Sequence, residues 1–173
     1  HENGLKKADS GDLKGAIEDF TKSIAANPNQ VISHHDRALA RKLSKDYKGA
    51  IEDYTKVIEL NNEIKGEDNK WTESIYLERG YCKFLVEDDE GAITDYTKVV
   101  EYNPESYIGF GRRGIVNNFI GDHKKAVFDF RKALDFYYEN DEYELNKIIL
   151  YMKSGDSKFA LEDFEGARFD TNE

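Results

Sequence analysis

Residues 50–56 read AIEDYTK, and four related copies of this heptapeptide occur along the chain. The copies are AIEDFTK at 16–22, AITDYTK at 92–98, AVFDFRK at 126–132 and the weaker ALEDF at 160–164. The alanines that open the five copies lie 34, 42, 34 and 34 residues apart. Three equal intervals, and a fourth that is longer by eight residues, indicate a 34-residue internal repeat with one insertion.

Each copy has helical periodicity. Ala50, Ile51, Tyr54, Val57 and Ile58 fall on one stripe of an amphipathic helix. A second helical stretch precedes each copy, for example at residues 33–44, 73–86, 108–120 and 143–153. The sequence therefore predicts an all-α fold in which every unit is a helix, a turn, a second helix and a short link.

Turn and cap signals recur with the same period. An aspartate that is suited to N-cap the second helix stands four residues before every alanine, as Asp12, Asp46, Asp88, Asp122 and Asp156. Three of these caps follow a glycine, namely Gly11, Gly121 and Gly155. Pro28 and Pro104 follow two of the second helices and are expected to end them.

The period, the small residue that opens the second helix and the aromatic residue four positions later resemble the tetratricopeptide repeat family. Small residues twelve positions before the alanines also match this family, namely Gly4, Ala38, Gly80 and Gly114. The first helix departs from the family pattern near its end, where Arg41, Lys83 and Asn117 replace the usual aromatic residue. Ile148 replaces the small residue in the fifth unit, and the family proline is missing at Asn62 and Tyr138.

The resemblance implies a right-handed superhelical α-solenoid of about five helix-turn-helix units. We expect a single domain over residues 1–173, with repeats at about 1–30, 31–64, 73–106, 107–140 and 141–173. The insertion at about 65–72 is polar and predicts a solvated loop. Trp71 at its end has two open interpretations, a staple that holds the loop to the third repeat or a contact residue for a partner.

Acidic and basic residues also recur within the repeat. Asp19, Asp53, Asp95, Asp129 and Asp163 follow the alanines by three residues, and Arg37, Arg79, Arg113 and Lys147 precede them by thirteen. A catalytic site needs only one copy, so a feature present in every unit is expected to be structural. We expect partly exposed ion pairs that set helix register, each contributing about 0–1 kcal/mol.

Composition excludes several classes of function. The net charge of −10 disfavours binding to nucleic acids and to anionic membrane surfaces. The single cysteine, Cys82, is expected to be a small buried group, and it cannot form an intrachain disulfide or a thiolate metal cluster. One cysteine is typical of a reducing compartment, which favours the cytoplasm without establishing it.

No catalytic or cofactor motif is present in the sequence, which has neither a glycine-rich phosphate loop nor a nucleophile elbow. The chain is therefore predicted not to be an enzyme and to need no cofactor. His34 and His35 are adjacent and do not have the i, i+4 spacing of helical metal sites. His34 is expected to pack in the aromatic place that Tyr76 and Phe110 fill in later repeats, and no metal site is predicted.

The resemblance implies that the first helices of successive repeats line a concave groove. The groove residues that it predicts are Asp36, Leu39, Leu43, Glu78, Tyr81, Phe84, Leu85, Arg112, Ile115 and Phe119. We expect a scaffold that binds a peptide segment or partner protein in this groove. The ligand is expected to carry the apolar and basic side chains. Two alternatives stay open, namely self-association through the end repeats and a structural spacer within a larger protein.

Overall fold

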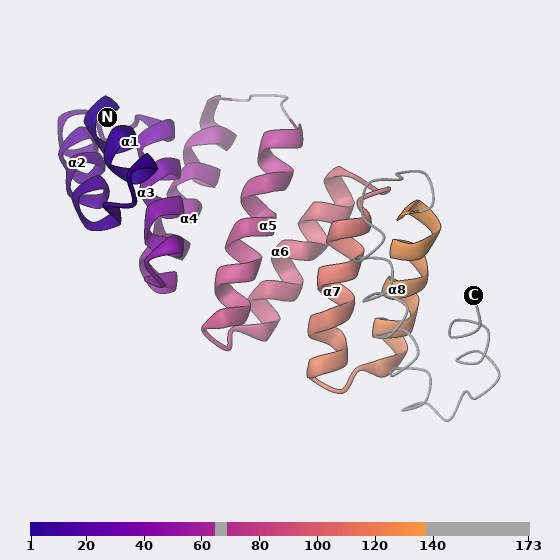
Figure 1. The fold of residues 1–173 in the computed structure, drawn as a ribbon. Helices are drawn as coiled ribbons and strands as arrows, with labels where there is room; N and C mark the ends of the chain where they lie inside the picture. The colour runs from indigo at the N-terminus through magenta and orange to yellow at the C-terminus, as the bar shows by residue number, and fades with distance from the viewer. Residues whose placement is uncertain (65–68, 138–173) are drawn as a thin grey trace. The chain divides into compact units, whose positions relative to one another are not determined.

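A computed structural model describes residues 1–64 and 69–137 of the 173-residue chain, and these residues contain eight α-helices and no strand. Figure 1 shows the helices, which are α1 (Glu2–Asp9), α2 (Leu13–Ala26), α3 (Val31–Leu43), α4 (Tyr47–Ile64), α5 (Asn69–Leu85), α6 (Asp89–Tyr102), α7 (Tyr107–Phe119) and α8 (His123–Tyr137). The predicted all-α repeat fold is confirmed. The fifth repeat, predicted at 141–173, lies outside the described residues.

The described residues fall into two compact units, one within residues 1–88 and one that begins at residue 89. In the first unit α1 packs on α2 and α3 packs on α4, while α2 also contacts α3 and α4 contacts α5. In the second unit α7 packs on α8 and contacts α6. Each unit is thus a layer of first helices (α1, α3, α5 or α7) packed on second helices (α2, α4, α6 or α8).

The repeated heptapeptide forms the core of each repeat. Its alanines are completely buried, at 0% exposure for Ala16, Ala50, Ala92 and Ala126. The aromatic residues four positions later are equally buried, with Phe20 at 1%, Tyr54 at 0%, Tyr96 at 2% and Phe130 at 0%. The stretch recurs because each second helix must bury the same small-plus-aromatic surface against its own first helix.

Two glycines of the first helices allow this close packing. A Cβ added at Gly4 would lie 2.7 Å from Cε1 of Phe20, and one at Gly114 would lie 2.8 Å from Cε1 of Phe130. Both distances are too short for carbon atoms that are not bonded to each other. The aromatic ring of the second helix therefore lies directly on the backbone of the first.

The predicted N-caps are confirmed where the structure gives their hydrogen bonds. Asp12 accepts a hydrogen bond from the backbone N–H of Gly15 at 2.9 Å, and Asp46 accepts one from Gly49 at 3.1 Å. Asp122 accepts one from Lys125 at 3.3 Å. These side chains satisfy amides that have no partner within the helix. The predicted cap Asp156 lies outside the described residues.

The predicted insertion is partly helical. α5 begins at Asn69, so residues 69–72 belong to the helix and residues 65–68 lie outside the described part of the chain. The ring of Trp71 lies 5.8 Å from the ring of His35 on α3, and Asn61 donates a hydrogen bond to Thr72 at 2.9 Å. Trp71 thus holds the start of α5 against α3. None of the described helices is long and apolar enough to cross a membrane.

The turn between the two helices of each repeat requires one left-handed residue. Gly11 and Gly121 have φ angles of 84° and 83°, while Lys45 and Glu87 stand at the corresponding places with φ of 67° and 63°. A left-handed conformation costs a residue with a Cβ about 1–2 kcal/mol. The second and third repeats therefore accept a strain that the first and fourth avoid.

Substitutions at this turn are expected to have opposite effects in different repeats. Gly121→Ala should lower the free energy of unfolding by about 1 kcal/mol, because a Cβ there meets no atom within 4 Å and only the backbone conformation is penalised. Glu87→Gly should raise it by about 0.5 kcal/mol, since relief of strain exceeds the added freedom of the unfolded chain. Urea unfolding of the two variants tests this, and a shift of the same sign for both would contradict it.

Candidate partner-binding surface

The exposed side of α3 carries a stripe of large apolar side chains. Ile32, Asp36, Leu39 and Leu43 follow each other at spacings of four, three and four residues, which places them on one helical face. Ile32 is 44% exposed, Leu39 38% and Leu43 58%. This face lies away from the buried Ala38 and Ala40 and is left open by the packing of α3 on its neighbours.

The same registers are apolar and exposed on the neighbouring first helices of residues 1–88. Leu5 on α1 and Tyr81 on α5 correspond to Leu39, and Leu85 corresponds to Leu43. Their exposures are 39%, 40% and 37%. We name Leu5, Leu39, Leu43, Tyr81 and Leu85 together the apolar row.

Two polar contacts hold these helices side by side. Nε2 of His1 lies 2.8 Å from Oδ2 of Asp36, which joins the start of α1 to α3. Nζ of Lys42 lies 2.5 Å from Oε2 of Glu78, which joins α3 to α5. The apolar row therefore crosses three adjacent helices.

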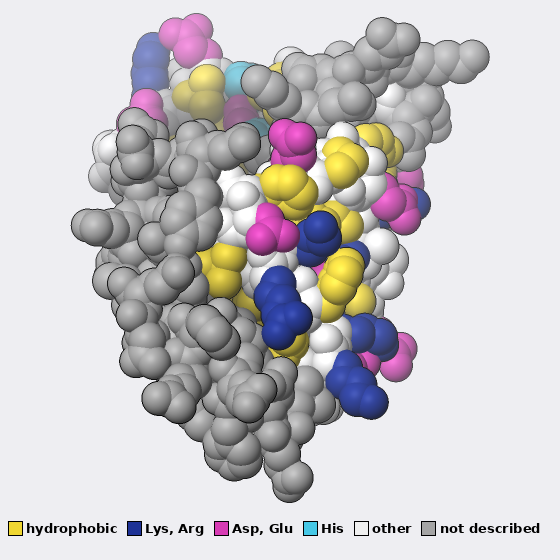
Figure 2. Space-filling model, turned by 90° about the vertical axis from the view of Figure 1, so that its right-hand side faces the viewer, with side chains coloured by type: hydrophobic (Ala, Val, Ile, Leu, Met, Phe, Trp, Pro, Cys, Tyr) yellow, Lys and Arg dark blue, Asp and Glu magenta, His cyan; other side chains and the backbone are white. Residues whose placement is uncertain are grey.

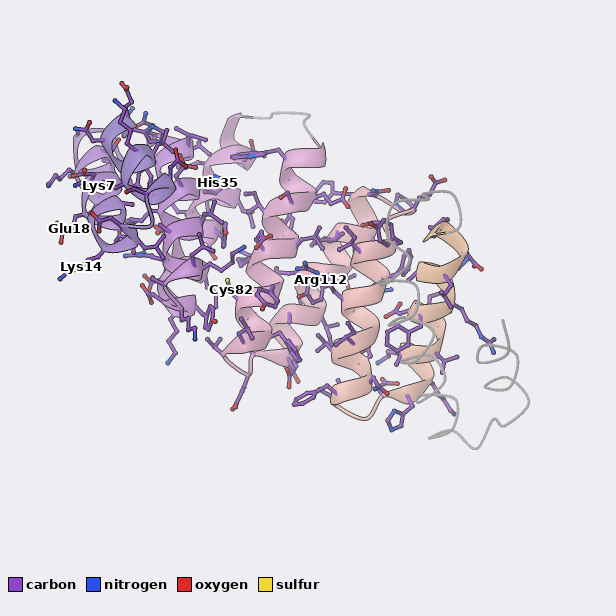
Figure 3. The ribbon with its side chains drawn as sticks, in the orientation of Figure 1. Lys7, Lys14, Glu18, His35, Cys82 and Arg112 are labelled. Atoms are coloured by element: carbon purple, nitrogen blue, oxygen red, sulfur yellow. The ribbon has the colours of Figure 1, made fainter. Side chains whose placement is uncertain are left out.

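The ten predicted groove residues divide between the two units. The first unit brings together Asp36, Leu39, Leu43, Glu78, Tyr81 and Leu85 on this face, with Phe84 half-buried beside it. α7 of the second unit carries Arg112, Ile115 and Phe119 (Figure 3 labels Arg112). Phe119 is 70% exposed, whereas Ile115 is half-buried against the core around Phe110 and Phe130.

The acidic residues of this face already have partners. Asp36 is close to two imidazoles, Nε2 of His1 and Nδ1 of His35, the latter at 3.0 Å, and its side chain is 15% exposed. Glu78 is paired with Lys42. The charge that these carboxylates offer to a basic partner is therefore smaller than the sequence suggests. The open apolar side chains remain the main feature of the surface.

Sequence reasoning missed three residues of this surface, Leu5, Ile32 and Lys42. Leu5 could have been found, because it stands eleven residues before Ala16, in the register of Leu39 and Tyr81. Lys42 has no such signal, since Ala8, Phe84 and Asn118 occupy its register in the other repeats. Only the packing of α3 beside α5 brings Lys42 to Glu78.

A buried polar network stands behind this face, between the first and second helices. Arg37 of α3 donates two hydrogen bonds to Asp53 of α4, from Nε at 2.9 Å and from Nη2 at 2.6 Å. A third bond at 3.0 Å joins its Nη1 to Thr21 of the preceding repeat. Asp53 is 3% exposed. Arg37 thus joins α3 to α4 and also joins this helix pair to α2 of the preceding repeat.

The fourth repeat forms the same network. Arg113 donates to both carboxylate oxygens of Asp129, at 3.0 and 2.7 Å, and to Thr97 of the preceding helix at 3.2 Å. Asp129 is 2% exposed. Arg79 likewise donates to Thr55 at 3.0 Å. The role predicted for these recurring residues, ion pairing that sets helix register, matches these contacts.

The energy expected for these pairs was too low. The carboxylate side chains of Asp53 and Asp129 are 4% and 2% exposed and those of their arginines 13% and 16%, so the value of about 0–1 kcal/mol that suits surface pairs does not apply. The residues that interrupt the family's aromatic position also belong to the network. Arg41 donates to Asp53 at 2.8 Å and Asn117 donates to Asp129 at 3.0 Å, so this position serves the buried carboxylate. Each of the four described repeats has a donor there, with Lys7 and Lys83 in the other two.

The other chemically notable side chains are inert in their surroundings. Cys82 is completely buried, as predicted, and burial raises the pKa of its thiol to about 11, so the thiol stays protonated near neutral pH. Burial likewise raises the pKa of Tyr54. His34 is 6% exposed and packs as predicted, with Nε2 at 2.8 Å from the carbonyl oxygen of Pro28. These groups stabilise the fold and do not assemble into a reaction centre.

Comparison with known proteins agrees with this geometry. Residues 32–64 match the model of a family described as tetratricopeptide repeat. The match covers one repeat of this chain, the helix pair α3 and α4. No curated protein matches it.

Solved structures share the fold of this repeat chain at low sequence identity. A crystal structure of MamA has a TM-score of 0.77 and 22% identity, covering 96% of this chain and 93% of that one. A MamA fragment from Desulfovibrio magneticus RS-1 gives 0.79 and 15%, covering 98% and 87%. YrrB, described as a TPR protein with an unusual peptide-binding site, gives 0.75 and 14%, covering 96% and 78%. At these identities the similarity establishes the fold alone.

Removal of the arginine from one buried pair should destabilise the protein strongly. Arg113→Ala is expected to lower the free energy of unfolding by about 3 kcal/mol or more, because it leaves Asp129 buried without its main donor. Lys56→Ala, which removes an exposed pair with Glu59, should cost about 0–1 kcal/mol. In a double-mutant cycle, Arg113→Ala with Asp129→Ala should cost less than the sum of the single changes. Strictly additive effects measured by urea unfolding would contradict the buried pairing.

Proposed function

We propose that this chain is a protein-interaction scaffold that holds a peptide segment or partner surface along the exposed side of its first helices. The observation that carries the proposal is the apolar row, in which equivalent positions of α1, α3 and α5 are large, apolar and more than a third exposed. The core of every repeat is complete without these side chains. A surface of this kind is typical of a binding site for another chain.

The spacing of the row defines what would bind. Neighbouring packed helices lie about 8–10 Å apart, and an extended peptide advances about 3.3 Å per residue. A bound segment would therefore present an apolar side chain at about every third residue. Asp36 is already paired with imidazoles and Glu78 with Lys42. Apolar anchors would therefore supply most of the binding affinity. Basic residues in the ligand would add a smaller, salt-sensitive contribution.

Two solved structures of the same fold support a protein or peptide as the ligand. The structure of YrrB is described as having an unusual peptide-binding site, and another match is the Cut9–Hcn1 hetero-tetramer of APC/C. Self-association through the end repeats is the alternative. It would appear as a molar mass that rises with concentration in light scattering, whereas the scaffold proposal expects a constant mass.

Selection from a random peptide library tests the proposal. Peptides that bind the intact chain should carry apolar residues about three positions apart. The double substitution Leu39→Ser with Leu43→Ser should weaken their binding at least tenfold, while helicity and the unfolding midpoint stay nearly unchanged because both side chains are exposed. Tyr102→Ser, a change of a similarly exposed aromatic residue at the end of the second helix α6, serves as the control. Binding that survives the leucine changes would contradict the assignment of the surface.

A further inference from the structure

We propose that the second-helix side of residues 89–137 carries a separate peptide-binding cleft, suited to an acidic side chain next to a large apolar one. This inference goes beyond the proposed function, because it uses the opposite side of the repeat and different helices. It follows from a cavity and from three residues that differ from their counterparts in the other repeats.

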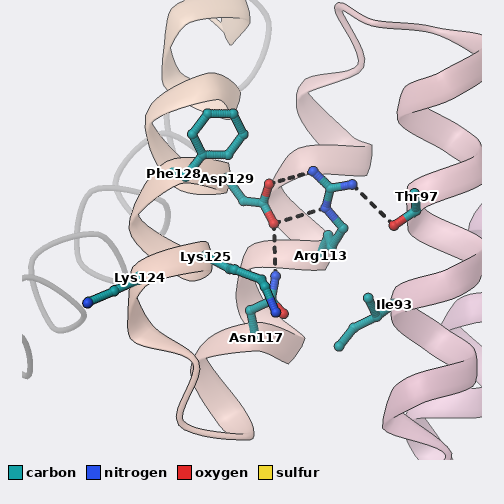
Figure 4. A pocket seen from close by; sticks show the side chains of 8 residues that line it. All are labelled: Ile93, Thr97, Arg113, Asn117, Lys124, Lys125, Phe128 and Asp129. Atoms are coloured by element: carbon teal, nitrogen blue, oxygen red, sulfur yellow. Dashed lines mark hydrogen bonds and ion pairs between the residues drawn. The ribbon is translucent and has the colours of Figure 1, made fainter.

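The cleft lies where α6 and α8 flank α7. Its volume is about 510 Å³, which is within the range of ligand sites in proteins. Figure 4 shows the lining residues, which are Ile93 and Thr97 of α6, Arg113 and Asn117 of α7, and Lys124, Lys125, Phe128 and Asp129 of α8. The buried Arg113–Asp129 pair forms its floor, so the base of the cleft is fixed by the repeat network.

The first distinguishing residue, Asn117, makes room for a ligand. In the second repeat the corresponding Arg41 extends over its second helix and donates both to Asp53 and to the carbonyl oxygen of Gly49, the latter at 3.0 Å. Asn117 is shorter and donates to Asp129. The volume that a guanidinium group fills in the second repeat is therefore left empty in the fourth.

The second distinguishing residue, Lys125, replaces a glycine that the other described repeats retain as Gly15, Gly49 and Gly91. A Cβ at Gly49 would come 2.3 Å from Oδ2 of the capping Asp46, so the repeat favours glycine there. In the fourth repeat Nζ of Lys125 instead pairs with Oδ2 of the capping Asp122 at 2.6 Å. Lys125 is thus accommodated by the cap but not required by the fold.

The third distinguishing residue, Phe128, is 55% exposed. The other described repeats have Glu18, Glu52 and Thr94 at this place, all exposed and polar. Figure 3 shows Glu18 on α2, together with Lys14, extending away from the helix pair. An aromatic ring in this position contributes nothing to the repeat core, yet it forms a wall of the cleft.

The charges around the cleft select an acidic ligand. Arg113, Lys124 and Lys125 line it together with Asp129, whose two oxygens already accept from Arg113 and Asn117. Lys125 is also paired with Asp122, so Lys124 is the lining cation that a carboxylate would reach most readily. Within residues 1–64 and 69–137, Lys124 forms no ion pair and its side chain is exposed. Residues 89–137 contain seven lysines and arginines against eight acidic residues, although the whole chain has a net charge of −10.

The apolar and basic parts together define the ligand. Ile93 and Phe128 offer apolar contact, and Lys124 and Lys125 also line the cleft. A carboxylate side chain could reach the lysines while an adjacent phenylalanine or leucine side chain contacts Phe128. Figure 2 shows a similar mixture of hydrophobic and charged side chains on one described face of the molecule. A short segment that combines glutamate with phenylalanine or leucine therefore suits this cleft.

Fluorescence anisotropy with three labelled peptides tests the proposal. The probe peptide GSEFELSG should bind the full chain at least tenfold more tightly than its basic counterpart GSKFKLSG or the apolar-deleted GSEAEASG. Its affinity should fall as salt is raised, because ammonium–carboxylate contacts are screened. Equal binding of all three peptides would overturn the proposal.

Variants that restore the residues of the third repeat identify the site. Lys125→Gly combined with Phe128→Thr should weaken binding of GSEFELSG at least tenfold, while circular dichroism and the melting temperature show that the fold persists. Asn117→Arg, which refills the cleft, should do the same. The matched changes Lys48→Ala and Glu52→Ala at the corresponding surface of α4 should have no effect.

The leucine variants separate this cleft from the apolar row. Leu39→Ser with Leu43→Ser should leave binding of GSEFELSG unchanged even if it abolishes binding of library-selected peptides. Loss of GSEFELSG binding in that variant, or its survival after Lys125→Gly with Phe128→Thr, would show that the peptide binds elsewhere and would overturn the assignment of the cleft.

Discussion

The structure depends on a carboxylate that the second helices α4 and α8 bury against their first helices. Asp53 and Asp129 are almost inaccessible to solvent and are neutralised by bidentate arginines from α3 and α7. A buried carboxylate without such a donor would oppose folding. Because the same arginine also reaches a threonine of the preceding repeat, the requirement to satisfy one charge fixes the position of three helices. The interior of each repeat is therefore both apolar and specifically oriented.

Repetition helps to separate structural from functional residues in this chain. The alanine and the aromatic residue that recur in each described repeat are buried, as is the aspartate in all of them except the first, and these residues explain the fold. Residues that vary among repeats at exposed registers are not needed for packing. Lys125 and Phe128 are of this kind, and both lie beside the same cleft. Exposed residues that depart from the repeat pattern are therefore candidates for ligand binding, because packing of the fold does not require them.

The two proposed surfaces differ in physical character. The apolar row is an open face whose acidic residues are already paired, so apolar contact would dominate binding there. The cleft on α6, α7 and α8 is hollowed, has a fixed polar floor and carries an excess of basic side chains. They would therefore favour different ligands, and binding at one need not exclude binding at the other.

The sequence alone determined the helical repeat, its period, its caps and most of its core. These features depend on local periodicity and on side chains within a single unit, which a repeated pattern displays directly. The exposed positions of α3 and α5 could likewise be assigned from the family resemblance. The tertiary structure decided which side chains meet across units of the repeat. It showed that Arg41 and Asn117 serve a buried aspartate, that Lys42 pairs with Glu78, and that Phe128 borders a cleft. Such contacts join residues from separate helices, and their distances follow from how the helices pack, which periodicity along one helix does not specify.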